Sequence, residues 1–563
     1  MAVCKYCYTF AAMIETIKKY RIVIGLMVLS LLLWQCARRG SPTGGPKDTT
    51  APVLLHATPK SGQLNFKAKK IRLQFDEFVV TKDVRKQLII SPPMETFPII
   101  TPTSASKWLE ITIVDTLKPN TTYVMNFGNS IQDYNEGNPY NDFMYVFSTG
   151  SYLDSLWVEG DVEDAIAPEA DHFVTVMLYD YNEQYNDSLV YKQKPKYVTN
   201  TLDSLYEFDF DFLKEGKYKL IALKDKNGNY LFNPKEDKIA FLKEPITVAH
   251  LKDSMSPVYR LRLFKEVPPY KAHRPTQVAD NRIEFGFEGK ADSVVIKPIS
   301  KVSADFKYTL SKDPKKDTLN LWYSPKQKDS VLFTVAHQQK IDTFKVRLKE
   351  LKKLDSLQVS AAYSGDLPME RDFAFKSNIP IVATDASKIK IFKGKDSIPI
   401  PFKASLEKEG LELRLAFEKQ HGESYRVEAL PKALTDFFGN TNDTLKVSAS
   451  TKKEEDLAIF KLKLTAEKVR FPVIVQLTNE KGTEVARELY AEKPEVLYLF
   501  KDVLPAKYRL RLIEDRNANK QWDTGDFLQQ RQPERVWYFK DLVELRANWE
   551  VEETWQVSYT EGS

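Results

Sequence analysis

Apolar and polar residues alternate along most of the chain. After residue 50 the sequence contains short runs in which every second position is apolar, among them KIRLQF, WLEITIV, RIEFGF, TLNLWY and LELRLAF. Alternation with a period of two over four to eight residues is typical of strands that bury one face. Clusters of turn-forming residues such as KPNTT, YNEGNP and FFGNTND separate the runs. The pattern predicts an all-β protein built from tandem β-sandwich domains.

Length and composition set the scale of this prediction. At 563 residues the chain is too long for one hydrophobic core, and we expect about four or five domains. Hydrophobic residues make up 42% of the chain and aromatic residues 12%, which is enough for packed cores. Lys and Arg number 82 against 77 Asp and Glu. So small a positive surplus, with no basic face, gives no reason to expect nucleic acid as a partner.

The N-terminal residues have the pattern of an export signal. A basic stretch at 18–21 precedes the 13-residue apolar run IVIGLMVLSLLLW at 22–34. That run is short for a membrane span and suits the core of a signal peptide, which we assign to residues 1–35. Translation starts at Met1 or at Met13, and the sequence leaves both open.

Cys36 stands two positions after the end of the apolar run, and no cysteine follows it. After removal of the signal peptide the protein has a single thiol and cannot form an internal disulfide. The stretch LLLWQC resembles the lipobox of bacterial lipoproteins, which implies that Cys36 carries the lipid and becomes the first residue. Trp34 and Gln35 depart from the small residues usual there, so a plain signal peptide with an incidental cysteine is the alternative. Residues 36–50 are rich in Gly, Pro, Ser and Thr and predict a flexible tether.

The first predicted domain, 51–150, contains TPKSGQLNFKAKKIRLQFDEFV, LKPNTTYVMNFGNSIQDYNEGN and a final FSTG. These segments resemble the bacterial Ig-like domain of surface-layer and envelope proteins, in its fifth family. With the lipobox and tether, the chain resembles Ig-like lipoproteins of Bacteroidetes envelopes. The resemblance implies a lipid anchor in the outer membrane and protein partners in the envelope.

A second Ig-like domain is predicted at 356–452. The segment ESYRVEALPKALTDFFGNTND repeats the pattern of the first domain. Tyr425 matches Tyr123, and Asp436 matches Asp133. A less distinctive β-domain at 266–355 precedes this second copy.

A separate repeat joins two further regions. YKLIALKDKNGNYLFNPKED at 218–237 and YRLRLIEDRNANKQWDTGDF at 508–527 align without a gap at an offset of 290, which indicates duplication. The F-x-x-L-x-x-G-x-Y-x-L approach to the first segment resembles the prealbumin-like, or carboxypeptidase-regulatory-like, β-sandwich. We assign that fold to 151–265 and 453–563. Phe232 and Trp522, at equivalent positions, are predicted to fill the domain cores.

The repeated segments end in loops that are rich in Asp and Asn. Their oxygen-bearing residues fall at positions one, three, five, nine and twelve, as in a calcium loop, and position seven offers a backbone carbonyl. The predicted structural Ca²⁺ ligands are Asp515, Asn517, Asn519, Gln521, Asp523 and Asp526 in the second loop, and Asp225, Asn227, Asn229, Leu231, Asn233 and Glu236 in the first. The second loop has three carboxylates and the first has two, which favours tighter Ca²⁺ binding by the second loop.

Position six of a calcium loop is usually glycine, but Tyr230 and Lys520 stand there. The alternative is therefore that Asp and Asn only cap turns through the backbone.

The sequence contains no familiar catalytic motif. It has no H-E-x-x-H, no G-x-S-x-G, no phosphate-binding G-x-x-x-x-G-K-[ST] and no G-x-G-x-x-G, and its six histidines are scattered. The adjacent carboxylates of Asp76 and Glu77 fit the end of an Ig-like strand. With Cys36 predicted to carry lipid, no cysteine nucleophile is left. We therefore predict that the protein is not an enzyme.

These observations together predict a non-enzymatic outer-membrane lipoprotein whose five β-sandwich modules form a rod. Its predicted role is a scaffold or interaction subunit of the cell envelope, as part of an outer-membrane protein assembly. A surface adhesin or glycan-binding protein is the alternative, and a hydrolase ranks third, because facing carboxylates cannot be recognised from sequence. Arg38 and Arg39 follow the cysteine, and the leaflet that holds the lipid stays open.

Overall fold

The computed structural model describes residues 47–201, 206–250, 257–327, 330–351, 353, 355–395, 398–467 and 469–557. The predicted signal peptide, the lipid-bearing Cys36 and most of the tether lie outside the described residues. Strands make up 48% of the structure and helices 4%, so the all-β prediction is confirmed. Within these ranges no helix has both the length and the apolar character needed to cross a membrane.

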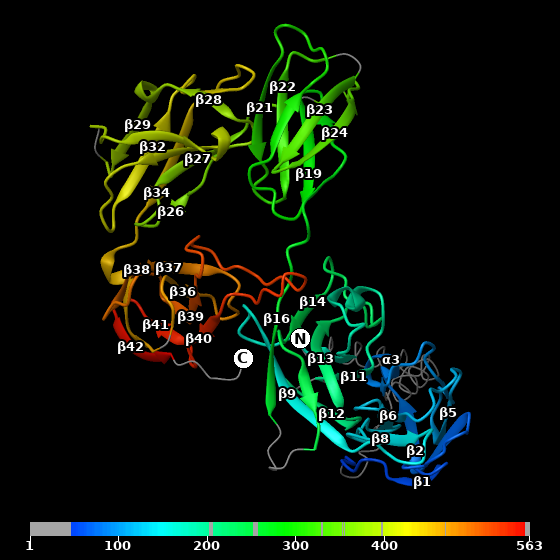
Figure 1. Ribbon diagram of the computed structural model, residues 1–563. Helices are drawn as coiled ribbons and strands as arrows, with labels where there is room; N and C mark the ends of the chain where they lie inside the picture. The colour runs from blue at the N-terminus through cyan, green and yellow to red at the C-terminus, as the bar shows by residue number, and fades with distance from the viewer. Residues whose placement is uncertain are drawn as a thin grey trace, which may run out of the picture.

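Five sandwich cores follow one another along the described chain. We name the parts that build them units 1 to 5: β1–β8, β9–β16, β17–β24, β25–β34 and β35–β42 (Figure 1). The predicted tandem of β-sandwiches is thus present. The domain boundaries given above stay predictions.

Unit 1 comprises β1 (Leu54–Thr58), β2 (Lys70–Thr81), α3 (Val84–Gln87), β3 (Ile89–Ser91), β4 (Ile99–Thr101), β5 (Ser106–Thr112), β6 (Thr122–Asn126), β7 (Ile131–Asp133) and β8 (Met144–Ser148). One sheet has the order β1-β2-β5-β4, with β7 beside β2, and the other is β3-β6-β8. Alternation along β2 buries Ile71, Leu73 and Phe75 between the sheets, as the sequence pattern requires.

Unit 3 is also a two-sheet structure, and unit 4 adds a small sheet of two strands to its two larger sheets. Unit 3 comprises β17 (Lys271–Ala272), β18 (Thr276–Ala279), β19 (Arg282–Glu288), β20 (Val295–Pro298), β21 (Lys307–Lys312), β22 (Thr318–Ser324), β23 (Ser330–His337) and β24 (Lys340–Arg347). Unit 4 comprises β25 (Val359–Ala361), β26 (Gly365–Asp366), β27 (Phe373–Ser377), β28 (Ile381–Thr384), η2 (Ala386–Lys388), β29 (Ile389–Lys393), β30 (Lys403–Glu407), η3 (Lys408–Gly410), β31 (Glu412–Ala416), β32 (Ser424–Ala429), β33 (Leu434–Asp436) and β34 (Leu445–Ser450).

Units 1 and 4 share the two features that the sequence paired. The Tyr123 hydroxyl accepts a hydrogen bond from the backbone N–H of Lys118 at 2.9 Å, and the Tyr425 hydroxyl accepts one from Gln420 at 2.8 Å. Both bonds reach back five residues and fix the start of a strand, as in the tyrosine corner of Ig-like folds. Asp133 and Asp436 each cap the following turn by accepting backbone N–H groups.

Units 2 and 5 have the same strand order, which supports the duplication. Unit 2 comprises β9 (Leu156–Asp164), β10 (Thr175–Asp180), η1 (Asp187–Tyr191), β11 (Tyr197–Asn200), β12 (Glu207–Leu213), β13 (Gly216–Lys224), β14 (Lys238–Phe241), β15 (Ile246–Val248) and β16 (Val258–Leu263). Unit 5 comprises η4 (Glu454–Asp456), β35 (Ala458–Ala466), β36 (Val473–Thr478), β37 (Val485–Ala491), β38 (Tyr498–Val503), β39 (Ala506–Glu514), β40 (Val536–Tyr538), β41 (Val543–Leu545) and β42 (Glu550–Val557).

The two units also match in their pairing. Sheet β11-β10-β13-β14 corresponds to β37-β36-β39-β40, and sheet β12-β9-β16 corresponds to β38-β35-β42. In both units the last strand lies parallel to the first.

The units do not form a rod. The chain turns back, so that unit 5 lies against unit 2, and units 2 to 5 close a ring with unit 1 attached outside it (Figure 1). Unit 1 contacts unit 2 where the Val198 N–H donates to Ser91 Oγ at 3.1 Å. Unit 4 contacts unit 5 where His421 Nε2 meets Asp502 Oδ1 at 2.8 Å. The predicted rod is therefore wrong. Strand periodicity indicates only which side chains fill each core and carries no information about contacts between units.

Candidate functional site

The two Asp/Asn loops have the same backbone conformation. Asp225 Oδ2 accepts the Tyr230 N–H at 2.7 Å, and Asp515 Oδ2 accepts the Lys520 N–H at 2.8 Å. Tyr230 and Lys520 have φ values of 60° and 63°. Position six, where a calcium loop has glycine, is therefore occupied by residues that rarely adopt a positive φ.

In each loop a buried carboxylate that was not among the predicted residues accepts hydrogen bonds from two separate backbone N–H groups. In unit 2, Asp237 accepts the N–H groups of Lys226 at 3.0 Å and Asn233 at 2.8 Å. In unit 5, Glu534 accepts those of Arg516 at 2.7 Å and Asp523 at 2.9 Å. The donors keep the offset of 290, but the acceptors are 297 apart.

The alignment without a gap is therefore wrong beyond position nine of the loop. Asn233 and Asp237 are separated by four positions and Asp523 and Glu534 by 11, so the second loop is seven residues longer. Strand pairing agrees, because Ile221 pairs with Phe241 while its counterpart Arg511 pairs with Tyr538. Glu236 and Asp526, matched by the sequence, do not occupy equivalent positions.

The structure brings some of the predicted calcium ligands together. Asn517 Nδ2 and Asn519 Nδ2 both donate to Asp523 Oδ2 at 2.6 Å, and Asn227 Nδ2 donates to Glu236 Oε2 at 2.8 Å. The remaining predicted ligands close local turns, in which Asn229 and Asn519 accept the N–H groups of Leu231 and Gln521, Asn233 accepts that of Lys235, and Asp526 accepts that of Gln529.

The side chains of the loops are thus mostly engaged with one another and with the backbone. Lys290 of unit 3 also forms an ion pair with Asp523 Oδ1 at 3.1 Å. Burial opposes ionisation of Asp523, but hydrogen bonds from Asn517 and Lys290 hold its pKa below the ordinary value. In the described ranges no three His, Cys, Asp or Glu side chains group closely enough to hold a metal ion. Calcium binding stays a prediction.

The seven extra residues place a new segment in unit 5, residues 524–533, which we call the docking segment. Besides hydrogen bonds within the segment, its side chains contact unit 2 and the chain just after it. Thr524 Oγ1 donates to the Lys265 carbonyl at 2.6 Å, and Gln532 Nε2 donates to the Phe241 carbonyl at 2.7 Å. Gln530 bridges two side chains, donating to Asp187 at 2.8 Å and accepting from Lys219 at 3.1 Å.

Phe527 is the apolar centre of this contact. It is 0% exposed, although none of its hydrophobic cluster belongs to the sandwich core of unit 5. Its ring meets that of Phe241 edge-on with centroids 5.2 Å apart. Gly525 makes the approach close enough, because a Cβ there would lie 2.6 Å from the Phe264 ring. The backbone N–H of Phe527 donates to Glu266, whose pKa burial raises.

The two predicted core aromatics both belong to the cluster that contains Phe527. Phe232 is buried, and its ring packs 5.4 Å from that of Tyr191, but it lies outside the sandwich core of unit 2, so the prediction that it fills that core is wrong. Trp522 is half-buried and packs against the same cluster as Phe527 rather than inside the core of unit 5. Its indole N–H donates to the Glu534 carbonyl at 3.1 Å. The two equivalent aromatics therefore meet in one cluster at the contact between units 2 and 5.

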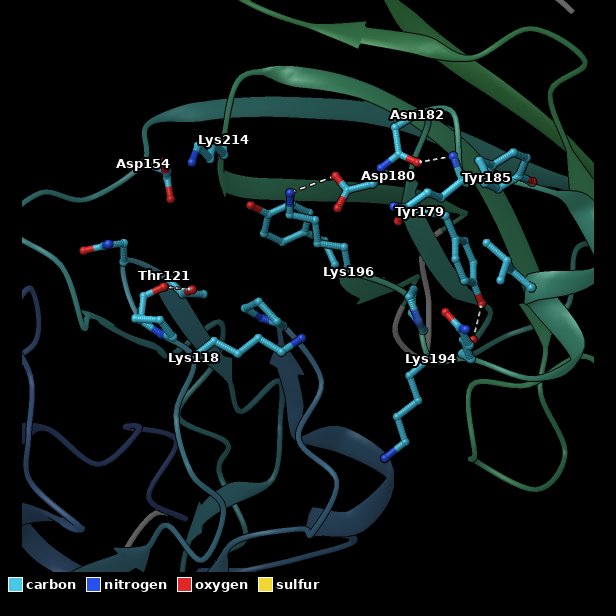
Figure 2. A pocket seen from close by; sticks show the side chains of 18 residues that line it. Lys118, Thr121, Asp154, Tyr179, Asp180, Asn182, Tyr185, Lys194, Lys196 and Lys214 are labelled. Atoms are coloured by element: carbon cyan, nitrogen blue, oxygen red, sulfur yellow. Dashed lines mark hydrogen bonds and ion pairs between the residues drawn. The ribbon is translucent and has the colours of Figure 1, made fainter.

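A second feature is a pocket of about 590 Å³ at the junction of units 1 and 2, which we call the junction pocket. Figure 2 shows Lys118 and Thr121 of unit 1 on one side and Asp180, Lys196 and Lys214 of unit 2 on the other. The lining is mainly polar, with both signs of charge.

The aromatic part of the junction pocket comes from unit 2. Tyr179 is buried and donates to the Gln193 carbonyl at 3.1 Å, while Tyr185 donates to Asp187 Oδ1 at 2.9 Å. Burial raises the pKa of both phenols, so they are neutral hydrogen-bonding groups at physiological pH. Lys196 forms an ion pair with Asp180 at 2.8 Å. The pocket can thus hydrogen-bond a polar ligand beside a tyrosine ring.

Asp76 and Glu77 lie within β2, which continues to Thr81, so the prediction that they end a strand is wrong, and they act structurally. Asp76 Oδ1 accepts the Val53 N–H at 2.8 Å, which ties the start of the chain to the sheet. Glu77 has a pKa raised mainly by burial, and nearby carboxylates add to it.

Comparison with known proteins identifies one family. Residues 48–149 match the bacterial Ig-like domain. That match confirms the resemblance seen in unit 1 and covers less than a fifth of the chain. No curated protein sequence matches the chain.

Solved structures show distant likeness only. Domains 1–6 of the surface-layer protein SbsC are 11% identical over 88% of this chain and 67% of theirs, with a TM-score of 0.14. The I9–I11 tandem of titin is 12% identical over 50% of this chain and all of its own, with a TM-score of 0.11. The E. coli alpha-2-macroglobulin is 10% identical over 87% of this chain and 42% of its own, with a TM-score of 0.14.

Proposed function

We propose that the protein is a non-enzymatic scaffold or interaction subunit of the bacterial cell envelope, anchored in the outer membrane by a lipid on Cys36. The proposal is supported by the Ig-like domain and tandem sandwiches, which offer large surfaces for contact, and by the predicted export signal and lipobox, which favour a location outside the cytoplasm. Other envelope proteins, held in an outer-membrane assembly, are the proposed partners.

The observation that carries the proposal is the docking of unit 5 on unit 2. Unit 5 is held against unit 2 by a buried phenylalanine and by four side-chain hydrogen bonds. A glycine allows the close approach to the Phe264 ring. Domains within a chain move relative to one another by default unless their contact is large and apolar. A closed ring of four units holds the binding surfaces in fixed relative positions, which is useful to a scaffold and unnecessary for independent binding modules on a string.

The test is purification of the tagged full chain in mild detergent, followed by identification and quantification of the proteins that accompany it. We expect integral outer-membrane proteins in stoichiometric amounts. Phe527→Asp, which opens the ring, should reduce that amount, whereas Leu528→Asp should not, because Leu528 is adjacent but 59% exposed. Purification of the chain alone would refute the scaffold, and turnover of a glycan or peptide panel would revive a hydrolase.

The membrane anchor needs its own test. Cys36→Ser should move the protein from the membrane fraction to the soluble fraction, because the acyl chains contribute about 0.8 kcal/mol per buried methylene. A variant that stays in the membrane fraction would show that the anchor lies elsewhere.

The junction pocket favours glycan binding as a second candidate function. Its hydrogen-bonding groups beside Tyr185 are of the kind that bind sugar hydroxyls. We expect Asn182→Ala and Lys214→Ala to abolish any binding of the full chain to a polysaccharide panel. Unchanged binding would exclude this pocket as the site.

A further inference from the structure

Lys219, within β13, is buried at the contact between units 2 and 5. It is 3% exposed, and lysine is rarely buried to this degree unless a carboxylate pairs with it. Its Nζ atom donates to two neutral acceptors, the Lys243 carbonyl at 2.7 Å and Gln530 Oε1 at 3.1 Å. Burial lowers the pKa of the Lys219 ammonium group, against the opposing charges of Asp187 and Glu244. The neutral amine, which has a free electron pair, is therefore more accessible here than on an exposed lysine.

Gln530, in the docking segment of unit 5, places its side-chain amide between this lysine and a carboxylate. Its Nε2 atom donates to Asp187 Oδ2 of unit 2 at 2.8 Å and to the Phe527 carbonyl at 2.9 Å. Because an amide oxygen accepts and an amide nitrogen donates, only this orientation of the amide suits both the lysine and the carboxylate. Gln530 also has a φ of 51°, which residues of its kind rarely adopt.

The duplicated unit lacks the buried amine. Arg509 stands 290 positions after Lys219, and its Nε atom donates to the Glu480 carbonyl at 2.9 Å. A guanidinium group stays protonated and does not act as a nucleophile. The lysine is therefore specific to the copy that receives the docking segment.

A purely structural role explains the position of Lys219 less well. Taking an ammonium group out of water is costly, and hydrogen bonds to neutral acceptors do not compensate as a carboxylate partner would. Apolar side chains would serve a simple contact between the units at least as well. An amine, an amide and a carboxylate in sequence are, in contrast, the groups that amide exchange requires.

We propose that Lys219 and Gln530 form an isopeptide bond that joins units 2 and 5 covalently. The Lys219 amine attacks the side-chain amide carbon of Gln530, so a bond forms between Nζ and that carbon and the bond from the carbon to Nε2 breaks. Asp187 is the catalytic residue, because its carboxylate accepts a proton from the attacking nitrogen and transfers it to Nε2. Nε2 leaves as ammonia, and the balance requires no oxidant or other reactant.

Docking supplies the proximity that this reaction needs. The two side chains are 311 positions apart in the chain, and docking holds the amine against the amide oxygen, one bond from the carbon that it attacks. Groups held in this way react as if at very high concentration. The bond forms only after unit 5 docks and then keeps the ring closed. Any measurement of the equilibrium between the docked and undocked states of unit 5 therefore needs Lys219→Arg as its background.

The test is tryptic digestion of the purified full chain under denaturing conditions, followed by mass spectrometry of the peptides. We expect a branched peptide in which residues 218–224 are joined to residues 521–531, lighter by one ammonia than the two peptides together. Trypsin should not cut after Lys219, because its amine is acylated. The branched peptide also distinguishes this bond from ammonia lost elsewhere in the chain. Complete cleavage after Lys219, with no branched peptide, would overturn the proposal.

Variants assign the roles. Lys219→Arg keeps the charge and hydrogen-bond donors but cannot form the bond, so the branched peptide should be absent. Asp187→Asn leaves both reacting groups in place and should also prevent the bond, because the proton transfer is lost. Gln529→Ala is the matched control, since Gln529 is the adjacent amide and is exposed, and it should keep the bond. A branched peptide at the wild-type level in Asp187→Asn would overturn the assigned catalytic role.

Two variants connect the bond to docking. Phe527→Asp, which opens the ring, should lose the branched peptide, whereas Leu528→Asp should keep it, because Leu528 is 59% exposed. A cross-link in the opened chain would show that docking does not bring the two groups together. Absence of the bond from a chain that still purifies with its partners would overturn this proposal and leave the scaffold standing.

Discussion

Replacing Phe527 with alanine should open the ring without unfolding the units. Phe527 belongs to unit 5 in sequence, yet its fully buried side chain packs against Phe241 and Phe264 of unit 2. Removal of a buried phenylalanine costs about 3–5 kcal/mol. Because the Phe527 side chain packs on unit 2, its removal shifts the equilibrium between the docked and undocked states of unit 5. At about 1.4 kcal/mol for each factor of ten, the lower figure raises the open population roughly 100-fold.

Tryptic cleavage after Arg531 measures that population. Arg531 lies within the docking segment, where its backbone exchanges two hydrogen bonds with Asp526 in the docked state. Cleavage that is slow relative to closing tracks the equilibrium population of the open form. We therefore expect cleavage after Arg531 to accelerate by about two orders of magnitude in Phe527→Ala, while the melting of the sandwich cores changes little.

Leu528→Ala is the control for this experiment. Leu528 is the next residue along the same segment and is 59% exposed, so its removal should leave the cleavage rate unchanged. If Phe527→Ala lowered the melting temperature of unit 5 without faster cleavage after Arg531, Phe527 would be acting as a core residue of its own unit. The reasoning would then be refuted.

Three further predictions concern the same loop. Gly525→Ala places a Cβ 2.6 Å from the Phe264 ring and should accelerate the same cleavage, because overpacking costs about 1–3 kcal/mol; an unchanged rate would show that the ring can move aside. Glu534 has a pKa raised by burial above 4.5, so its stabilising contribution is present below that pH and is lost as the pH rises through the folded-state pKa. Urea melts should therefore show wild type losing stability relative to Glu534→Gln across that window, and parallel pH profiles would contradict the shift. Added Ca²⁺ should raise the melting midpoint of the full chain and EDTA should lower it, if the loop at 515–526 binds the ion; identical midpoints would reduce the loop to capped turns.

Local patterns in the sequence were sufficient to predict which side chains form the cores. Alternation along β2 predicts which side chains lie between the sheets, since successive residues of a strand point to opposite faces. The match of Tyr425 to Tyr123 predicts a shared strand start, and the hydroxyl of each makes the same backbone hydrogen bond. Such features depend on residues close together in sequence, and they can be recognised without coordinates.

Features that depend on distant residues were missed. Asp237 and Glu534 have the same role, but a length difference of seven residues hides their equivalence from an alignment without a gap. One signal was present, because Phe527 and Leu528 are large apolar side chains in a mainly polar loop. The contact between units 2 and 5 gave no other signal, since the segments that face each other lie about 200 or more positions apart in the chain and meet only after unit 5 docks.

The duplication explains why a short insertion had so large an effect. Units 2 and 5 share a topology, and each presents its Asp/Asn loop at the same corner. Units 3 and 4 connect them, so docking is an intramolecular event that does not depend on the protein concentration. The contact made by the docking segment then keeps the ring closed. Seven added residues that carry Gly525 and Phe527 can therefore convert two copies of one fold into a single frame.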